Sequence, residues 1–166
     1  MDAQGPSKAR PYVEQANTTY TNVIDEDNHL GKLFGFKAIP NGLLIDEKGI
    51  LKYMQFGGFD IQKPQTAEIV HEWAKPTFSS DASTLSPDHL GMDDHLKAIA
   101  LFQQGTFEFR NGDTAAALGK WKNALALAPD NLVIRKQIWA VENPDKFYSG
   151  HDVDYNWQRE QFEKGL

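Results

Sequence analysis

The sequence predicts an α/β unit, in which helices flank a β-hairpin, followed by an all-α helical region. The hairpin is indicated by two short apolar runs, 43–45 and 50–56, on either side of a turn that ends in Gly49. The helical region is indicated by apolar residues that recur three or four positions apart from Asp93 onward.

The domain boundaries follow from a change in composition. The stretch 77–92 is rich in serine and threonine near its start, which is typical of a linker. We therefore expect an α/β part at 1–76 and a helical part at 93–166.

Composition and charge exclude several classes of protein. The chain has 166 residues, of which 40% are hydrophobic, including four tryptophans and ten phenylalanines, so it can bury a core. A formal net charge of −6 argues against a nucleic-acid partner or an anionic membrane surface. No apolar run is long enough to span a membrane. The first residues lack a signal-peptide pattern, which favours the cytoplasm if Met1 is the natural start.

The first elements are predicted from local signals. Pro6 and the apolar residues after it favour a helix over 6–16, and the β-branched stretch 18–24 favours an extended segment. The acidic cluster 25–28 supplies N-caps for a helix over 28–34. That cluster lacks the glycine and the glutamate of a calcium-binding EF-hand loop, so we expect capping and no metal site.

Proline precedes the predicted hairpin and a pair of glycines follows it. Pro40 cannot donate a hydrogen bond, so it fits best at the first residue of a strand, where a cis peptide bond is possible. The glycine pair in 56–59 predicts a bend after the second strand. Pro64 opens another helix, which ends before Pro76.

The stretch Gly-Phe-Lys-Ala-Ile-Pro-Asn-Gly-Leu-Leu-Ile-Asp-Glu-Lys-Gly at 35–49 resembles the second half of a thioredoxin-like domain. It is most similar to the redoxin branch, the peroxiredoxin-related thiol-disulfide proteins, and the resemblance covers roughly residues 2–75. The resemblance implies that Pro40 is cis and lies opposite the redox cysteines. It also implies that Ile39 offers backbone groups to an extended substrate, and that Asp25 is the aspartate before the small helix.

The sequence departs from that family because it contains no cysteine. Thiol-disulfide exchange requires a thiolate, so this chain alone has no catalytic residue for that reaction. We expect a fragment that lacks the active-site half, with Met1 to Gly5 just after a central strand. The strand at 43–45 would then have an open edge, which predicts self-association or poor solubility.

The first two helices of the helical region resemble a tetratricopeptide repeat. Helices are predicted over 93–110 and, after the stop and cap at 111–113, up to Ala128. The small, aromatic and proline positions of the repeat match Gly105, Ala117, Trp121, Ala124 and Pro129. Glu108 stands where an aromatic residue is expected, and only one repeat is clear. We therefore expect a helical appendage rather than a solenoid.

The last part of the chain is predicted to form helices over 132–141 and 155–164, with a loop between them. Its aromatic residues could line a ligand groove or could hold the terminal helix in place. They are Trp139, Phe147, Tyr148, Tyr155 and Trp157. The residues proposed to contact a partner are Trp121, Trp139, Tyr148 and Trp157.

No other catalytic or metal-binding pattern is found in the sequence. His89 and His95, with two aspartates between them, form the densest polar cluster, which we interpret as a solvated helix start. No cofactor is expected.

Two functions remain open. The first is a fragment of a thioredoxin-like thiol-disulfide oxidoreductase, with Ile39 and Pro40 in its substrate groove. The alternative is a cysteine-free interaction module whose tetratricopeptide-like helices bind a protein or peptide. A purely structural assembly piece is a third possibility.

Overall fold

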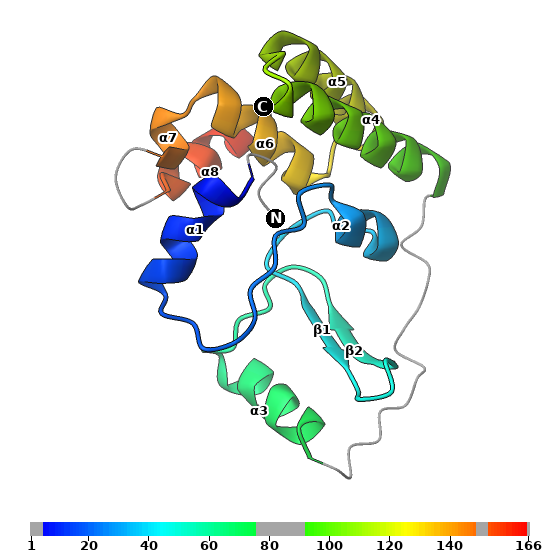
Figure 1. Cartoon of the computed structure of the whole chain (residues 1–166), viewed down its shortest axis with the longest axis vertical. Helices are drawn as coiled ribbons and strands as arrows, with labels where there is room; N and C mark the ends of the chain where they lie inside the picture. Colours follow the sequence, from blue (N-terminus) through cyan, green and yellow to red (C-terminus); the bar gives the residue numbers. More distant parts are fainter. Residues whose placement is uncertain (1–4, 76–91, 149–152, 166) are drawn as a thin grey trace.

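The computed structural model describes residues 5–75, 92–148 and 153–165 of the chain. Within these residues it forms eight helices and one two-stranded antiparallel sheet (Figure 1). The elements are α1 Pro6–Gln15, α2 His29–Phe34, β1 Gly42–Ile45, β2 Leu51–Gln55, α3 Pro64–Trp73, α4 Met92–Arg110, α5 Thr114–Leu127, α6 Leu132–Glu142, α7 Asp145–Tyr148 and α8 Tyr155–Glu163. The coarse prediction of an α/β unit followed by helices agrees with this order. The predicted linker, except Met92 at the start of α4, and residues 1–4 lie outside the described residues.

The hairpin forms because its turn satisfies its own backbone. The carboxylate of Asp46 accepts hydrogen bonds from the amides of Lys48, at 3.0 Å, and Ile50, at 2.8 Å. Gly49 has a φ of 79°, which glycine adopts without steric cost. The amide of Ile50, followed by that of Lys48, holds the pKa of Asp46 below its usual value. The turn therefore fixes the register that pairs Leu44 with Tyr53.

The short helix α2 is capped as the sequence predicts. Both carboxylate oxygens of Asp25 accept hydrogen bonds, from the amides of His29 at 2.8 Å and Leu30 at 2.9 Å. These amides have no partner inside the helix, so the aspartate satisfies them. Asn28, the residue just before α2, has a left-handed backbone and makes no side-chain cap bond.

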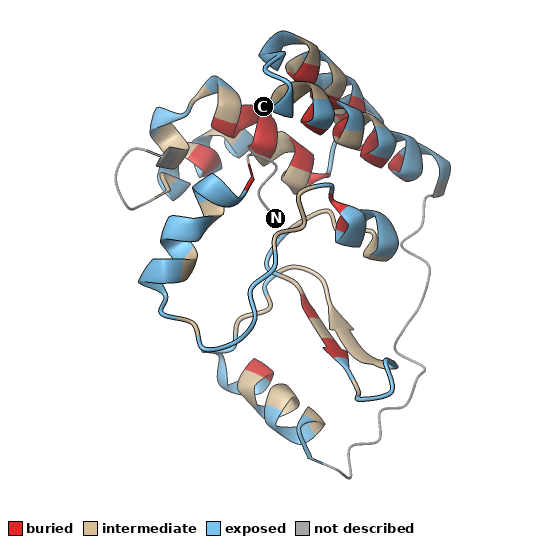
Figure 2. Ribbon diagram, viewed as in Figure 1, coloured by how far each residue is buried: buried red, intermediate tan, exposed pale blue. Residues whose placement is uncertain are grey.

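The hydrophobic core lies in the helical region, between α4, α5 and α6. Figure 2 shows most of the buried residues in these helices, whereas the hairpin is mainly half-buried. The core cluster consists of Ala98, Phe102, Ala117, Trp121, Ala124, Ala128, Ile134 and Ile138. In contrast, α1 has no buried residue and β1 buries the side chain of Leu44. The helical region is therefore the better-packed part of the chain.

Trp121 is the centre of this core. Its side chain is 0% exposed, and its indole nitrogen donates to the carbonyl of Phe102 at 3.0 Å. Its ring lies against Phe102 and Phe109, with centroids 5.9 and 5.5 Å away. Trp121 therefore has no surface for a partner, which corrects the expectation that it contacts one.

The stretch 18–24, predicted to be extended, belongs to no helix or strand, and Pro11 lies inside α1. One local prediction differs from the structure. The predicted loop near Phe147 contains the one-turn helix α7, whose Phe147 amide donates to the carbonyl of Pro144 at 3.2 Å.

We predict that Gly105→Ala lowers the free energy of unfolding by about 1–3 kcal/mol, because the added methyl group overpacks the core. An ideal Cβ at this position would lie 2.6 Å from the Trp121 ring and 3.0 Å from the carbonyl oxygen of Ala117. Urea denaturation followed by circular dichroism measures this change.

Gly119→Ala is the matched control, since Gly119 is also helical but has nothing within 4 Å of the added methyl group. We expect it to stabilise the protein by up to about 1 kcal/mol through helix propensity. Equal effects of the two substitutions would contradict the packing of α4 on α5.

Candidate functional site

The loop that joins α2 to β1 is held in a defined shape. The peptide bond between Ile39 and Pro40 is cis. The side chain of Asn41 donates to the carbonyl of Ala38 at 2.7 Å and accepts from the amide of Gly57 at 2.8 Å. The amide of Phe59 donates to the carbonyl of Pro40 at 3.4 Å. The loop is thus tied to the bend after β2, while the Ile39 side chain stays 53% exposed.

The same loop is fixed to the start of α6. The carbonyl of Lys37 accepts hydrogen bonds from the amides of Leu132, at 2.6 Å, and Val133, at 3.3 Å. The ammonium of Lys37 lies 2.8 Å from the carboxylate of Asp130 and, as a hydrogen-bond donor, holds its pKa below the usual range. Lys37, two residues before Ile39, therefore supplies a carbonyl acceptor at the N-terminus of α6, where amides have no partner within the helix.

A second set of contacts joins the α/β part to α4. Arg110 lies 2.7 Å from the carboxylate of Asp27 and 3.4 Å from that of Glu26. Gln103 donates to the backbone carbonyl of Asp27 at 2.7 Å. The hydrogen bond from Arg110 is the main cause of a lowered pKa at Asp27. Since these are surface pairs, we assign them an orienting role rather than a large share of stability.

His95 is buried between these two parts of the chain. It is 5% exposed, and its ring is the nearest group to Gly35 at the end of α2, about 3.9 Å from where a Cβ would stand. Burial lowers the pKa of His95, and the charge of Lys37 lowers it further. This overturns the interpretation of a solvated helix start for His95, while His89 lies outside the described residues.

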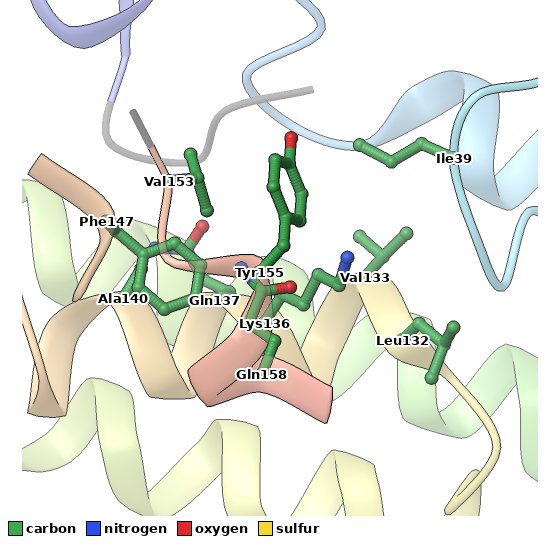
Figure 3. A pocket seen from close by; sticks show the side chains of 10 residues that line it. All are labelled: Ile39, Leu132, Val133, Lys136, Gln137, Ala140, Phe147, Val153, Tyr155 and Gln158. Atoms are coloured by element: carbon green, nitrogen blue, oxygen red, sulfur yellow. The ribbon is translucent and has the colours of Figure 1, made fainter. Parts of the chain in front are cut away.

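A cavity of about 220 Å³ opens beside Ile39. Figure 3 shows its lining, which comes from the Ile39 loop, from α6, and from the segment that runs through α7 into α8. The lining residues are Ile39, Leu132, Val133, Lys136, Gln137, Ala140, Phe147, Val153, Tyr155 and Gln158. The candidate site therefore combines the predicted substrate-groove residue with the helical region.

The predicted aromatic set is divided between packing and this cavity. Trp139 is 7% exposed and packs edge-on against Trp157 and Phe162, with centroids 5.6 and 5.0 Å away. It therefore holds α8 on α6, which corrects its assignment to partner binding. Trp157 is half-buried in the same cluster, whereas Tyr155 and Phe147 line the cavity. The side chain of Tyr148 lies outside the described residues.

A second hollow, of about 710 Å³, also borders Ile39. It is lined mainly by apolar side chains of α1, of the segment before α2 and of β1, among them Tyr12, Val23 and Leu43. In the described part of the chain, β1 pairs with β2 alone, so each strand keeps one open edge. The open edge that the sequence predicts is therefore present there, and Ile45 at its end is exposed.

Comparisons with known proteins identify no relative. No family model matches the chain, and neither a curated protein nor a solved structure is significantly similar to it. In the described residues, no helix is long and apolar enough to cross a membrane. The same residues hold no group of three or more histidines or acids that could bind a metal ion.

We predict that stability falls as pH is lowered through 6.5, the ordinary pKa of histidine, because His95 has a lower pKa when folded. The unfolded chain then binds the proton more readily than the folded chain does. The contribution of neutral His95 to the free energy of unfolding is therefore complete above pH 6.5 and is lost as the pH falls below it. Asp27 and Asp130, with pKa values below 3.8, lose their contribution only in stronger acid.

Urea denaturation of the protein and of His95→Gln, between pH 5 and pH 8, checks this prediction. His71→Gln is the control, because His71 is exposed on α3. A His95→Gln variant with an unchanged pH profile would contradict the assignment.

Proposed function

We propose that this chain is the substrate-binding part of a thioredoxin-like thiol-disulfide redoxin, and that it holds an extended polypeptide at the Ile39–Pro40 loop. One observation supports this most. Ile39, which precedes the cis proline, is exposed at the rim of a cavity made by α6 and α8. The loop, the hairpin and α3 follow one another in the order that the resemblance implies.

The backbone of Ile39 is suited to this role. In the described part of the chain, neither its N–H nor its C=O makes a hydrogen bond. An extended segment can therefore pair with both groups, as a strand pairs with a sheet edge. The exposed side chain of Ile39 would contact an apolar side chain of the same segment.

The chemistry needs a thiol from elsewhere. Because the sequence contains no cysteine, any redox cysteine must come from another stretch of polypeptide. The apolar hollow beside α1 and the open edge of β1 are the places where such a stretch would pack. The same edge could instead pair with a second copy of this chain.

A second candidate is an interaction module that uses α4 and α5. Phe107 on α4 is 63% exposed, and Leu96 and Leu127 are exposed on the same pair of helices. Large apolar side chains on a helix pair suit a protein or peptide partner. In this function the α/β part would support the helices and would bind nothing itself.

We predict that Ile39→Glu weakens binding of an unfolded polypeptide at least about tenfold, which corresponds to about 1.4 kcal/mol. The added charge would have to be buried under the bound segment. The probe is a fluorescent, reduced protein whose thiols are capped with iodoacetamide, and binding is measured by fluorescence anisotropy.

Ile61→Glu is the matched control, because Ile61 is also 53% exposed but lines none of the cavities described above. We expect it to bind the probe as the unsubstituted protein does. If Ile39→Glu binds normally and Phe107→Glu does not, the second candidate is correct and the first is wrong.

A further inference from the structure

Among the described residues that line the cavity beside Ile39, one is charged, Lys136 on α6. In Figure 3 the lysine lies among the side chains of Tyr155, Val133 and Gln158. Lys136 is half-buried, and within the described residues it has neither an ion pair nor a hydrogen bond from its ammonium. A half-buried cation without a partner is costly, so it marks a place where an anion is favoured.

Three carboxylates of the surrounding elements are engaged with other cations. Glu142 of α6 lies 2.6 Å from the ammonium of Lys122, and Asp154 before α8 lies 3.5 Å from that of Lys146. Asp130, before α6, is paired with Lys37. Burial alone lowers the pKa of Lys136, and no acidic group opposes it. The described part of the protein therefore supplies no carboxylate to Lys136.

A second donor without a partner lies beside the cavity. Gln137, which lines it, is 9% exposed, and its amide nitrogen makes no hydrogen bond in the described part. A buried donor without an acceptor is uncommon in folded proteins. Lys136 and Gln137 are therefore two donors of the lining that have no acceptor in the described part of the chain.

The rest of the lining is mostly apolar and the volume is small. Leu132, Val133, Ala140, Phe147 and Val153 supply hydrocarbon surface. A volume of about 220 Å³ is below the range of about 300–1,000 Å³ that drug-sized ligands occupy. One cation suits a singly charged group better than a phosphate, which is usually held by several donors.

We propose that this cavity binds a small monocarboxylate with a short apolar tail, whose carboxylate pairs with the Lys136 ammonium. The tail lies along Ala140 and Phe147, on the side of the lysine away from Ile39 (Figure 3). The proposal rests on the lining of the cavity and does not require that the loop binds a polypeptide, although both sites border Ile39.

Octanoate, octanamide and octylamine are the probes, because they share one tail and differ in the charge of the head group. Binding is followed on the full chain by two-dimensional NMR with a ¹⁵N label, which also reports where each probe binds. We expect octanoate to bind at least about fivefold more tightly than octanamide. The reason is that the carboxylate of octanoate makes a charge-assisted hydrogen bond with the half-buried Lys136 ammonium, whereas the neutral amide does not. We expect the amide signals of Val133, Ala140 and Gln158 to shift, and octylamine to bind least.

Lys136→Met tests the role of the charge, since methionine keeps the length and the apolar stem of the lysine. We expect this variant to lose the preference for octanoate over octanamide, and Lys136→Arg to retain part of it. Lys63→Met, which removes an exposed lysine before α3, should leave the preference unchanged.

Three results would overturn the proposal. They are equal binding of octanoate and octanamide, an unchanged preference in a folded Lys136→Met variant, and signal shifts confined to the hollow beside α1. The anisotropy assay with the unfolded polypeptide separates this proposal from the proposed function. The octanoate preference is tested by Lys136→Met and polypeptide binding by Ile39→Glu, so failure of one proposal is distinguished from failure of the other.

Discussion

The structure depends on the contact between the carbonyl of Lys37 and the first amides of α6. This carbonyl accepts hydrogen bonds from Leu132 and Val133, which lie more than ninety positions away along the sequence. Free amides at a helix N-terminus must find an acceptor. Here the side chain of Asn131 accepts from Val133 and Ile134. The loop before the cis proline supplies the acceptor for Leu132. Through this contact, the best-packed helices of the chain determine where Ile39 lies.

This dependence explains how a sparsely packed α/β part can present a defined loop. The hairpin has two strands, and α1 buries no residue, so these elements alone would be marginally stable. The helical region supplies a core around Trp121 and fixes the loop from one side. The side chain of Asn41, which accepts from the amide of Gly57, fixes it from the other.

The sequence allowed most elements to be predicted, because their signals are local. Asp25 caps α2 and Asp46 closes the hairpin through contacts within five residues, so the pattern of residue types was sufficient. Burial of His95 and Trp121 was not predicted, because it depends on helices that meet only in the folded chain. Ile39 was identified through a resemblance, whereas Lys136 and Gln137 were missed. A lysine on an amphipathic helix carries no signal until its neighbours in space are known.

Through the Lys37 contact, we expect the α/β part and the helical part to form one rigid unit. The most direct test is a distance measured by electron paramagnetic resonance between spin labels on Lys48→Cys and Gly119→Cys. Because the sequence has no cysteine, only these two positions take a label, and both are exposed. The account predicts a single narrow distance distribution in solution. A broad distribution, as expected of two parts that move independently, would contradict it.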